Sequence, residues 1–193
     1  PSDNVYQQTR LIKQGKAAFP PDFQPLAEWI KETYGVKPIN IVYNTIENSE
    51  RPRLEVCFEF EAEKAKFLDN NQFAPDTEKQ QAIAEQFGKI VEAKKAMVMV
   101  GAGHGAGFSD YNPEGVWVIY SAFDRVAKME ANENIPQADI DDLQKELANN
   151  DLWCISRMFS AATFFVYTDE QLEVYNHSGI KETWAKKYFQ LLK

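Results

Sequence analysis

Alternating apolar and polar side chains predict a β-hairpin in the first third of the chain. Residues 38–46 are enriched in β-branched side chains, and residues 48–52, which follow them, have the composition of a turn. Residues 53–60 then alternate strictly, so that their apolar and polar side chains point to opposite faces of a strand. The apolar face carries Leu54, Val56, Phe58 and Phe60, and the other face carries Glu55, Cys57, Glu59 and Glu61.

Apolar residues at helical spacing predict several helices. One helix is expected over residues 76–94, another over 136–148, and a third from the capping box that begins at Thr168 to Gly179. Residues 26–34 and 180–192 have the same pattern, and residues 3–16 predict a short first helix. Residues 152–159 fit either a strand or a helix, whereas residues 163–167 predict a strand.

Four of the nine glycines, Gly101, Gly103, Gly105 and Gly107, lie within seven residues. An apolar run, Met97–Val100, precedes them, and another, Val116–Tyr120, follows at a short distance. Continuous apolar runs of this length are typical of strands buried on both faces. Because glycine loses the most backbone entropy on folding, the cluster indicates either a close-approach turn or a mobile loop over a site.

Strands and helices alternate here without the regular order of a parallel α/β fold. We therefore expect an α+β fold with a mixed, mostly antiparallel sheet of about four to six strands packed by helices. A length of 193 residues predicts a single domain over 1–193, in which residues 1–25 form an N-terminal arm and a proline-rich connector.

Charge and composition exclude several classes of function. A net charge of −8 argues against binding to nucleic acid or to anionic membrane surfaces. No apolar run reaches the length of a membrane helix, and the first residues have no signal-peptide pattern. Two cysteines, Cys57 and Cys154, are too few for a zinc site, and they predict reduced thiols in a cytoplasmic protein, although one buried disulfide between them stays open.

The glycine segment partly matches a dinucleotide-binding fingerprint, with Gly101, Gly103 and Ala106 followed by Asp124 after an apolar strand. The fingerprint needs a helix directly after its glycines, and the three glycines and the proline of residues 104–115 exclude one. We expect no cofactor. The segment Gly101–Gly115 fits a lid that brings His104 and Asp110 to a small molecule, but it also fits a solvated surface excursion, which is what most loops are.

Two further groups of charged residues are candidates. The carboxylates around Cys57 suit acid–base or metal chemistry, but a solvated sheet face explains them as well, and no catalytic residue or metal ligand is assigned. In the helix over 136–148, Asp139, Asp142 and Glu146 form one exposed stripe when Ile140, Leu143 and Leu147 face inward. Residues 130–151 hold seven acids and one base, so this stripe is either a charge-steered binding surface or a merely solvated face.

These patterns favour a non-enzymatic, acidic cytoplasmic binding protein that contacts a basic protein through Asp139, Asp142 and Glu146. An inhibitor or immunity-type role against a cationic toxin or nuclease fits the charge. The alternative is a small-molecule binding protein or enzyme that uses the Gly101–Gly115 segment as its lid. Neither the oligomeric state nor the order of the strands follows from the sequence.

Overall fold

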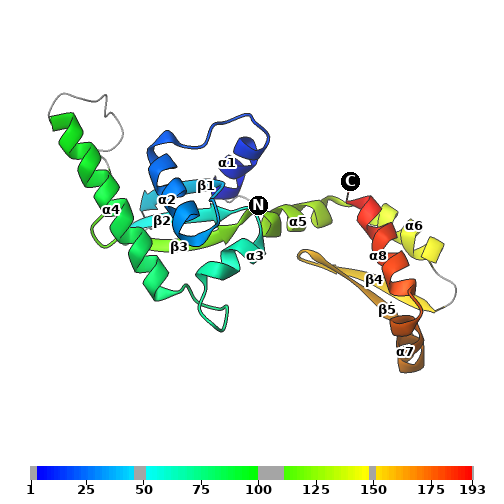
Figure 1. Ribbon diagram of the computed structural model, residues 1–193. Coiled ribbons are helices and arrows are strands. Elements are labelled where there is room, and N and C mark those ends of the chain that lie inside the picture. The colour runs from blue at the N-terminus through cyan, green and yellow to red at the C-terminus, as the bar shows by residue number, and fades with distance from the viewer. Residues whose placement is uncertain (1–3, 46–50, 100–110, 148–150, 193) are drawn as a thin grey trace. The chain divides into compact units, whose positions relative to one another are not determined.

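The chain forms two compact units, Pro1–Asp124 and Arg125–Lys193, each with its own sheet and its own buried core (Figure 1). The computed structural model describes residues 4–45, 51–99, 111–147 and 151–192. The expected α+β class is confirmed, since helices and small sheets make up both units. Within the described ranges, no helix combines the length and apolar character needed to cross a membrane.

The first unit is built around a three-stranded sheet of order β1-β2-β3. Strands β1 (Asn40–Thr45) and β2 (Pro52–Phe58) are antiparallel, whereas β2 and β3 (Trp117–Ala122) are parallel. The parallel pair is possible because a long crossover connects its strands. The helical elements of this unit are α1 (Asn4–Lys13), η1 (Pro21–Phe23), α2 (Gln24–Tyr34), α3 (Glu61–Lys64), η2 (Ala65–Phe67) and α4 (Thr77–Met99).

The larger core of this unit lies between one face of the sheet and helices α2 and α4. The register of the three strands places Ile41, Val56 and Tyr120 in one row across the sheet. The opposite face carries Asn40, Cys57 and Ser121 in the adjacent row, and it lies against α1, where the Asn40 amide donates to the Thr9 hydroxyl at 3.0 Å. Both faces of β2 are therefore buried, which the alternating pattern alone did not predict.

The second unit is a two-stranded hairpin with four helical segments. Antiparallel strands β4 (Leu152–Met158) and β5 (Ala161–Val166) pack through Ile155, Phe164 and Val166 on the core. Its helices are the greater part of α5 (Phe123–Asn134), α6 (Gln137–Leu147), α7 (Asp169–His177) and α8 (Ile180–Leu191). The predicted capping box opens α7, since Thr168 and Gln171 exchange backbone-to-side-chain hydrogen bonds at 3.3 and 3.0 Å.

The buried side-chain amide of Asn132 connects several parts of the second unit. The Asn132 side chain donates to the carbonyl groups of Phe159 at 2.7 Å and Ala161 at 3.3 Å, and it accepts from the Tyr188 hydroxyl. The Arg157 guanidinium donates to the carbonyls of Asn132 and Ile135 at 2.9 and 2.7 Å. These bonds satisfy carbonyl groups at the C-terminal end of α5 and connect that end to the hairpin and α8.

Two expectations differ from the structure. The strands form sheets of three and two strands rather than one sheet of four to six, because residues 152–166 pair with each other within the second unit. Met97–Met99 belongs to α4 rather than to a buried strand, since no glycine or proline stops the helix and Met97 is 56 % exposed. Residues 1–25, expected as an N-terminal arm and connector, contribute Val5, Tyr6, Thr9 and Phe23 to buried packing.

The turn of the hairpin contains a phenylalanine with left-handed backbone geometry. Phe159 has φ 54°, and its side chain is 67 % exposed. This conformation costs a non-glycine residue about 1–2 kcal/mol. We expect Phe159→Gly to raise the free energy of unfolding by about 0.5–1 kcal/mol, measured by chemical denaturation. Ser160→Gly, at the adjacent turn position, is the control, and an equal gain there would contradict this explanation.

Candidate interaction sites

The two groups of residues expected to form sites have different outcomes. Gly101, Gly103, His104, Gly105, Gly107 and Asp110 lie outside the described residues, so the proposed lid stays a prediction. The residues that follow are held firmly. Tyr111 packs on Phe23, Tyr43 and Phe87, and its hydroxyl donates to Asp22 at 3.2 Å. The second group, Asp139, Asp142 and Glu146, lies on α6.

Helix α6 presents its acids as predicted. Ile140, Leu143 and Leu147 are buried in the core of the second unit. Asp139, Asp142 and Glu146 are all exposed, and they border a shallow groove of about 240 Å³. The other residues of this α6–α8 groove are Leu143, Lys187, Gln190 and Leu191. The groove is thus lined by three carboxylates and two leucines together with a lysine and a glutamine.

Two lysines partly neutralise the negative charge of this stripe. Lys187 of α8 forms an ion pair with Glu146, and Lys145 donates to Asp142 at 2.9 Å. The neighbouring Asp141 accepts from the Gln137 amide at 2.9 Å. The hydrogen bond to Asp142 raises the pKa of the Lys145 ammonium. Asp139 forms no hydrogen bond or ion pair through its carboxylate within the described part of the chain.

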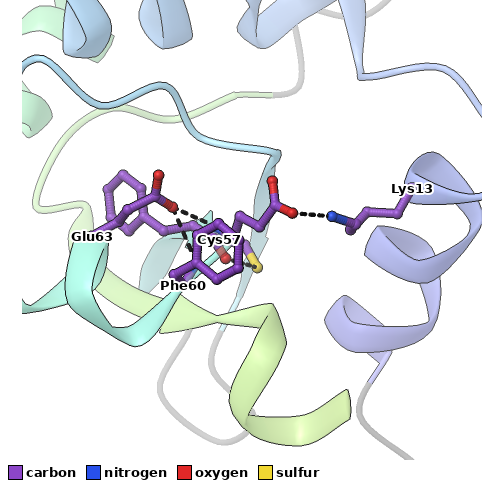
Figure 2. A network of polar contacts seen from close by, with 6 residues as sticks. Lys13, Cys57, Phe60 and Glu63 are labelled. Atoms are coloured by element: carbon purple, nitrogen blue, oxygen red, sulfur yellow. Dashed lines mark hydrogen bonds and ion pairs between the residues drawn. The ribbon is translucent and has the colours of Figure 1, made fainter. Parts of the chain in front are cut away.

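Charged residues near Cys57 take part in ion pairing and in capping the start of α3 (Figure 2). Lys13 of α1 forms an ion pair with Glu59, and one oxygen of Glu63 accepts the backbone N–H groups of Glu59 and Phe60, both at 3.1 Å. The Cys57 thiol is buried and lies 3.7 Å from the Phe58 carbonyl oxygen. These contacts hold the start of α3 against the end of β2. Among the described residues, no group of three or more His, Cys, Asp or Glu side chains is placed to hold a metal ion.

The second unit has another hollow besides the α6–α8 groove, and the sequence did not predict it. It lies between β5, α7 and α8, has a volume of about 250 Å³ and contains the rings of Phe164, Tyr175 and Trp184. Trp184 packs on Phe164 and Tyr175 with ring centroids 5.5 and 5.2 Å apart. The Tyr175 hydroxyl donates to Asp151, and this hydrogen bond to a carboxylate raises the pKa of the tyrosine. Sequence reasoning found the elements around this hollow but not the hollow itself, because it depends on how they pack.

Comparison with protein-family models, curated proteins and solved structures finds no match to this chain.

Proposed function

We propose that this chain is a non-enzymatic binding protein whose partner is a basic protein held on the acidic face of α6. The observation that carries this proposal is that Asp139, Asp142 and Glu146 are exposed together along one groove. Exposed carboxylates beside leucine side chains suit the binding of a cationic protein surface. A field of one sign speeds the approach of an oppositely charged partner and excludes partners of the same charge.

The charges of α6 also support a partner that carries lysine or arginine at its centre of contact. Asp139 has its carboxylate available, and the ion pair between Lys187 and Glu146 is exposed and open to exchange. Exposed pairs of this kind are worth about 0–1 kcal/mol, so an incoming cation can replace the lysine at small cost. An inhibitor that covers the cationic surface of a toxin or nuclease would have this character. Two free cysteines fit a cytoplasmic location for such a protein.

The test is the combined variant Asp139→Asn, Asp142→Asn, Glu146→Gln. Binding of a fluorescent oligolysine peptide, measured by anisotropy, is expected to weaken by about tenfold at low salt. The expected loss shrinks at physiological salt, because screening already weakens the interaction there.

The control variant removes the same charge elsewhere. Glu32→Gln, Glu92→Gln and Glu173→Gln neutralise three exposed acids on α2, α4 and α7. It should retain most of the oligolysine affinity, because the location of the charge matters as well as its sum. Equal losses in the two variants would mean that net charge alone attracts the peptide, and the proposed face would then be wrong.

A further inference from the structure

Strand β5 has an edge with no strand beside it. Within the described residues it pairs with β4 alone, so the sheet ends at this strand. In an antiparallel ladder, alternate residues direct their N–H and C=O groups away from the partner strand. Such an edge is a template for an additional strand, and a long exposed edge is a liability unless something covers it.

A groove follows this edge, formed by two adjoining hollows that share Thr163, Phe164, Val166 and Leu172. The inner hollow is the one of about 250 Å³ described above, and the outer one measures about 630 Å³. The outer hollow is lined both by Phe164, which packs on the core, and by Phe165, which faces the other side of the hairpin. A hollow that reaches both faces of a strand must lie at its edge. We call the two hollows together the β5 groove.

The inner hollow suits one apolar side chain. Its aromatic rings are held by mutual packing and by the bond from Tyr175 to Asp151, so the hollow is formed in advance. Leu172 of α7 forms part of the wall and is 48 % exposed. A dry cavity of about 150 Å³ can hold benzene, so a volume of about 250 Å³ accommodates the side chain of a phenylalanine or leucine.

The two hollows carry opposite charges. Lys181 lines the inner hollow, and it forms no hydrogen bond or ion pair within the described part of the chain. Asp169 and Glu170 line the outer hollow. The backbone N–H of Glu170 and the Thr168 hydroxyl lower the pKa of the Glu170 carboxyl. A ligand complementary to the whole groove is therefore extended, apolar in one part and charged oppositely at its two ends.

We propose that the β5 groove binds an extended peptide segment of a partner protein as a third strand of the hairpin sheet. One aromatic or branched aliphatic side chain of the segment occupies the inner hollow. A carboxylate of the segment lies at Lys181, and a basic residue lies at Asp169 and Glu170. This site differs from the acidic face of α6 in its residues and in what it recognises, because strand addition relies on the peptide backbone.

The first experiment selects the ligand with a display library of short random peptides on the full-length chain. Enriched peptides are expected to share one large apolar residue with a basic residue on one side and an acidic residue or a free C-terminus on the other. A selected peptide is then synthesised with N-methyl groups on its odd-numbered or on its even-numbered residues. Strand addition predicts at least tenfold weaker binding for one of these peptides and near-normal binding for the other.

Variants of the groove provide the second experiment. Leu172→Glu and Lys181→Glu are each expected to weaken the selected peptide by about tenfold or more. Val174→Glu and Lys186→Glu are matched controls on the same helices, and both are exposed and lie outside the groove. The combined α6 variant should bind the peptide normally, so failure of the proposed function and failure of this site are distinguishable.

Several results would overturn the proposal. A library that yields no enriched peptide would do so, as would equal tolerance of both N-methylated peptides, which would indicate a side-chain pocket without strand addition. A wild-type chain that dimerises, and that Leu172→Glu makes monomeric, would show that the occupant is a second copy instead.

Discussion

Phe67→Ala is expected to lower the stability of the first unit by about 3–5 kcal/mol. Phe67 lies in η2 and is fully buried. Its ring stacks on Phe58 with centroids 4.5 Å apart, and it contacts Tyr34 and Tyr120 edge-on or tilted, both at 5.2 Å. Alanine would remove most of these contacts and leave a cavity between the sheet and the crossover.

Amide hydrogen exchange of the full chain, read by mass spectrometry, measures this loss separately in each unit. Phe73→Ala is the matched control, since Phe73 lies close by in sequence and is 92 % exposed. Because each unit has its own core, we expect faster exchange in residues 1–124 and unchanged protection in residues 125–193. Equal loss in both units would support the single cooperative domain expected from chain length and contradict independent cores.

Asn132→Ala is expected to destabilise the second unit by about 3 kcal/mol. The buried Asn132 side chain makes three hydrogen bonds, to the hairpin turn and to the Tyr188 hydroxyl. Each such bond contributes about 1 kcal/mol, and partners left unsatisfied in the interior add to the loss. The hairpin turn would lose its hydrogen bonds to α5 and keep only those from Arg157 to the carbonyls of Asn132 and Ile135, so its protection against exchange should fall most.

Two further variants test whether the loss of stability follows the number of hydrogen bonds removed. Tyr188→Phe removes one of the three bonds, and we expect it to cost about 1–2 kcal/mol, clearly less than Asn132→Ala. Asn134→Ala, at an exposed position of the same helix, should change stability by less than about 0.5 kcal/mol. If Asn132→Ala behaved like Asn134→Ala, the network would not be what holds the hairpin to the helices.

Local patterns predicted most of the elements but little of their assembly. The period of Ile140, Leu143 and Leu147 was sufficient for α6, and the exchange of bonds between Thr168 and Gln171 follows directly from their spacing. The partition of the strands into two sheets could not be predicted, because pairing depends on contacts distant in sequence. The apolar run at Met97 was ambiguous for a related reason, since a short run fits a helix or a buried strand equally well.

For the acidic face of α6 too, the sequence predicted the local pattern but not the packing around it. Helical spacing placed Asp139, Asp142 and Glu146 on one stripe. The lysine that balances Glu146 lies 41 residues further along the chain, and only the packing of α6 on α8 brings it near. The β5 groove left no signal in the sequence, because an edge strand and its neighbouring helix become a groove only once the sheet order is known.

Capture of partners from a lysate of the source organism decides whether the acidic face of α6 holds a basic protein. The wild-type chain, the combined Asp139, Asp142 and Glu146 variant and the Glu32, Glu92 and Glu173 control would be immobilised side by side, and bound proteins would be eluted with rising salt. We expect a basic protein that the wild type and the control retain, that leaves as salt rises, and that the α6 variant does not capture. A partner held equally well by the α6 variant would contradict it.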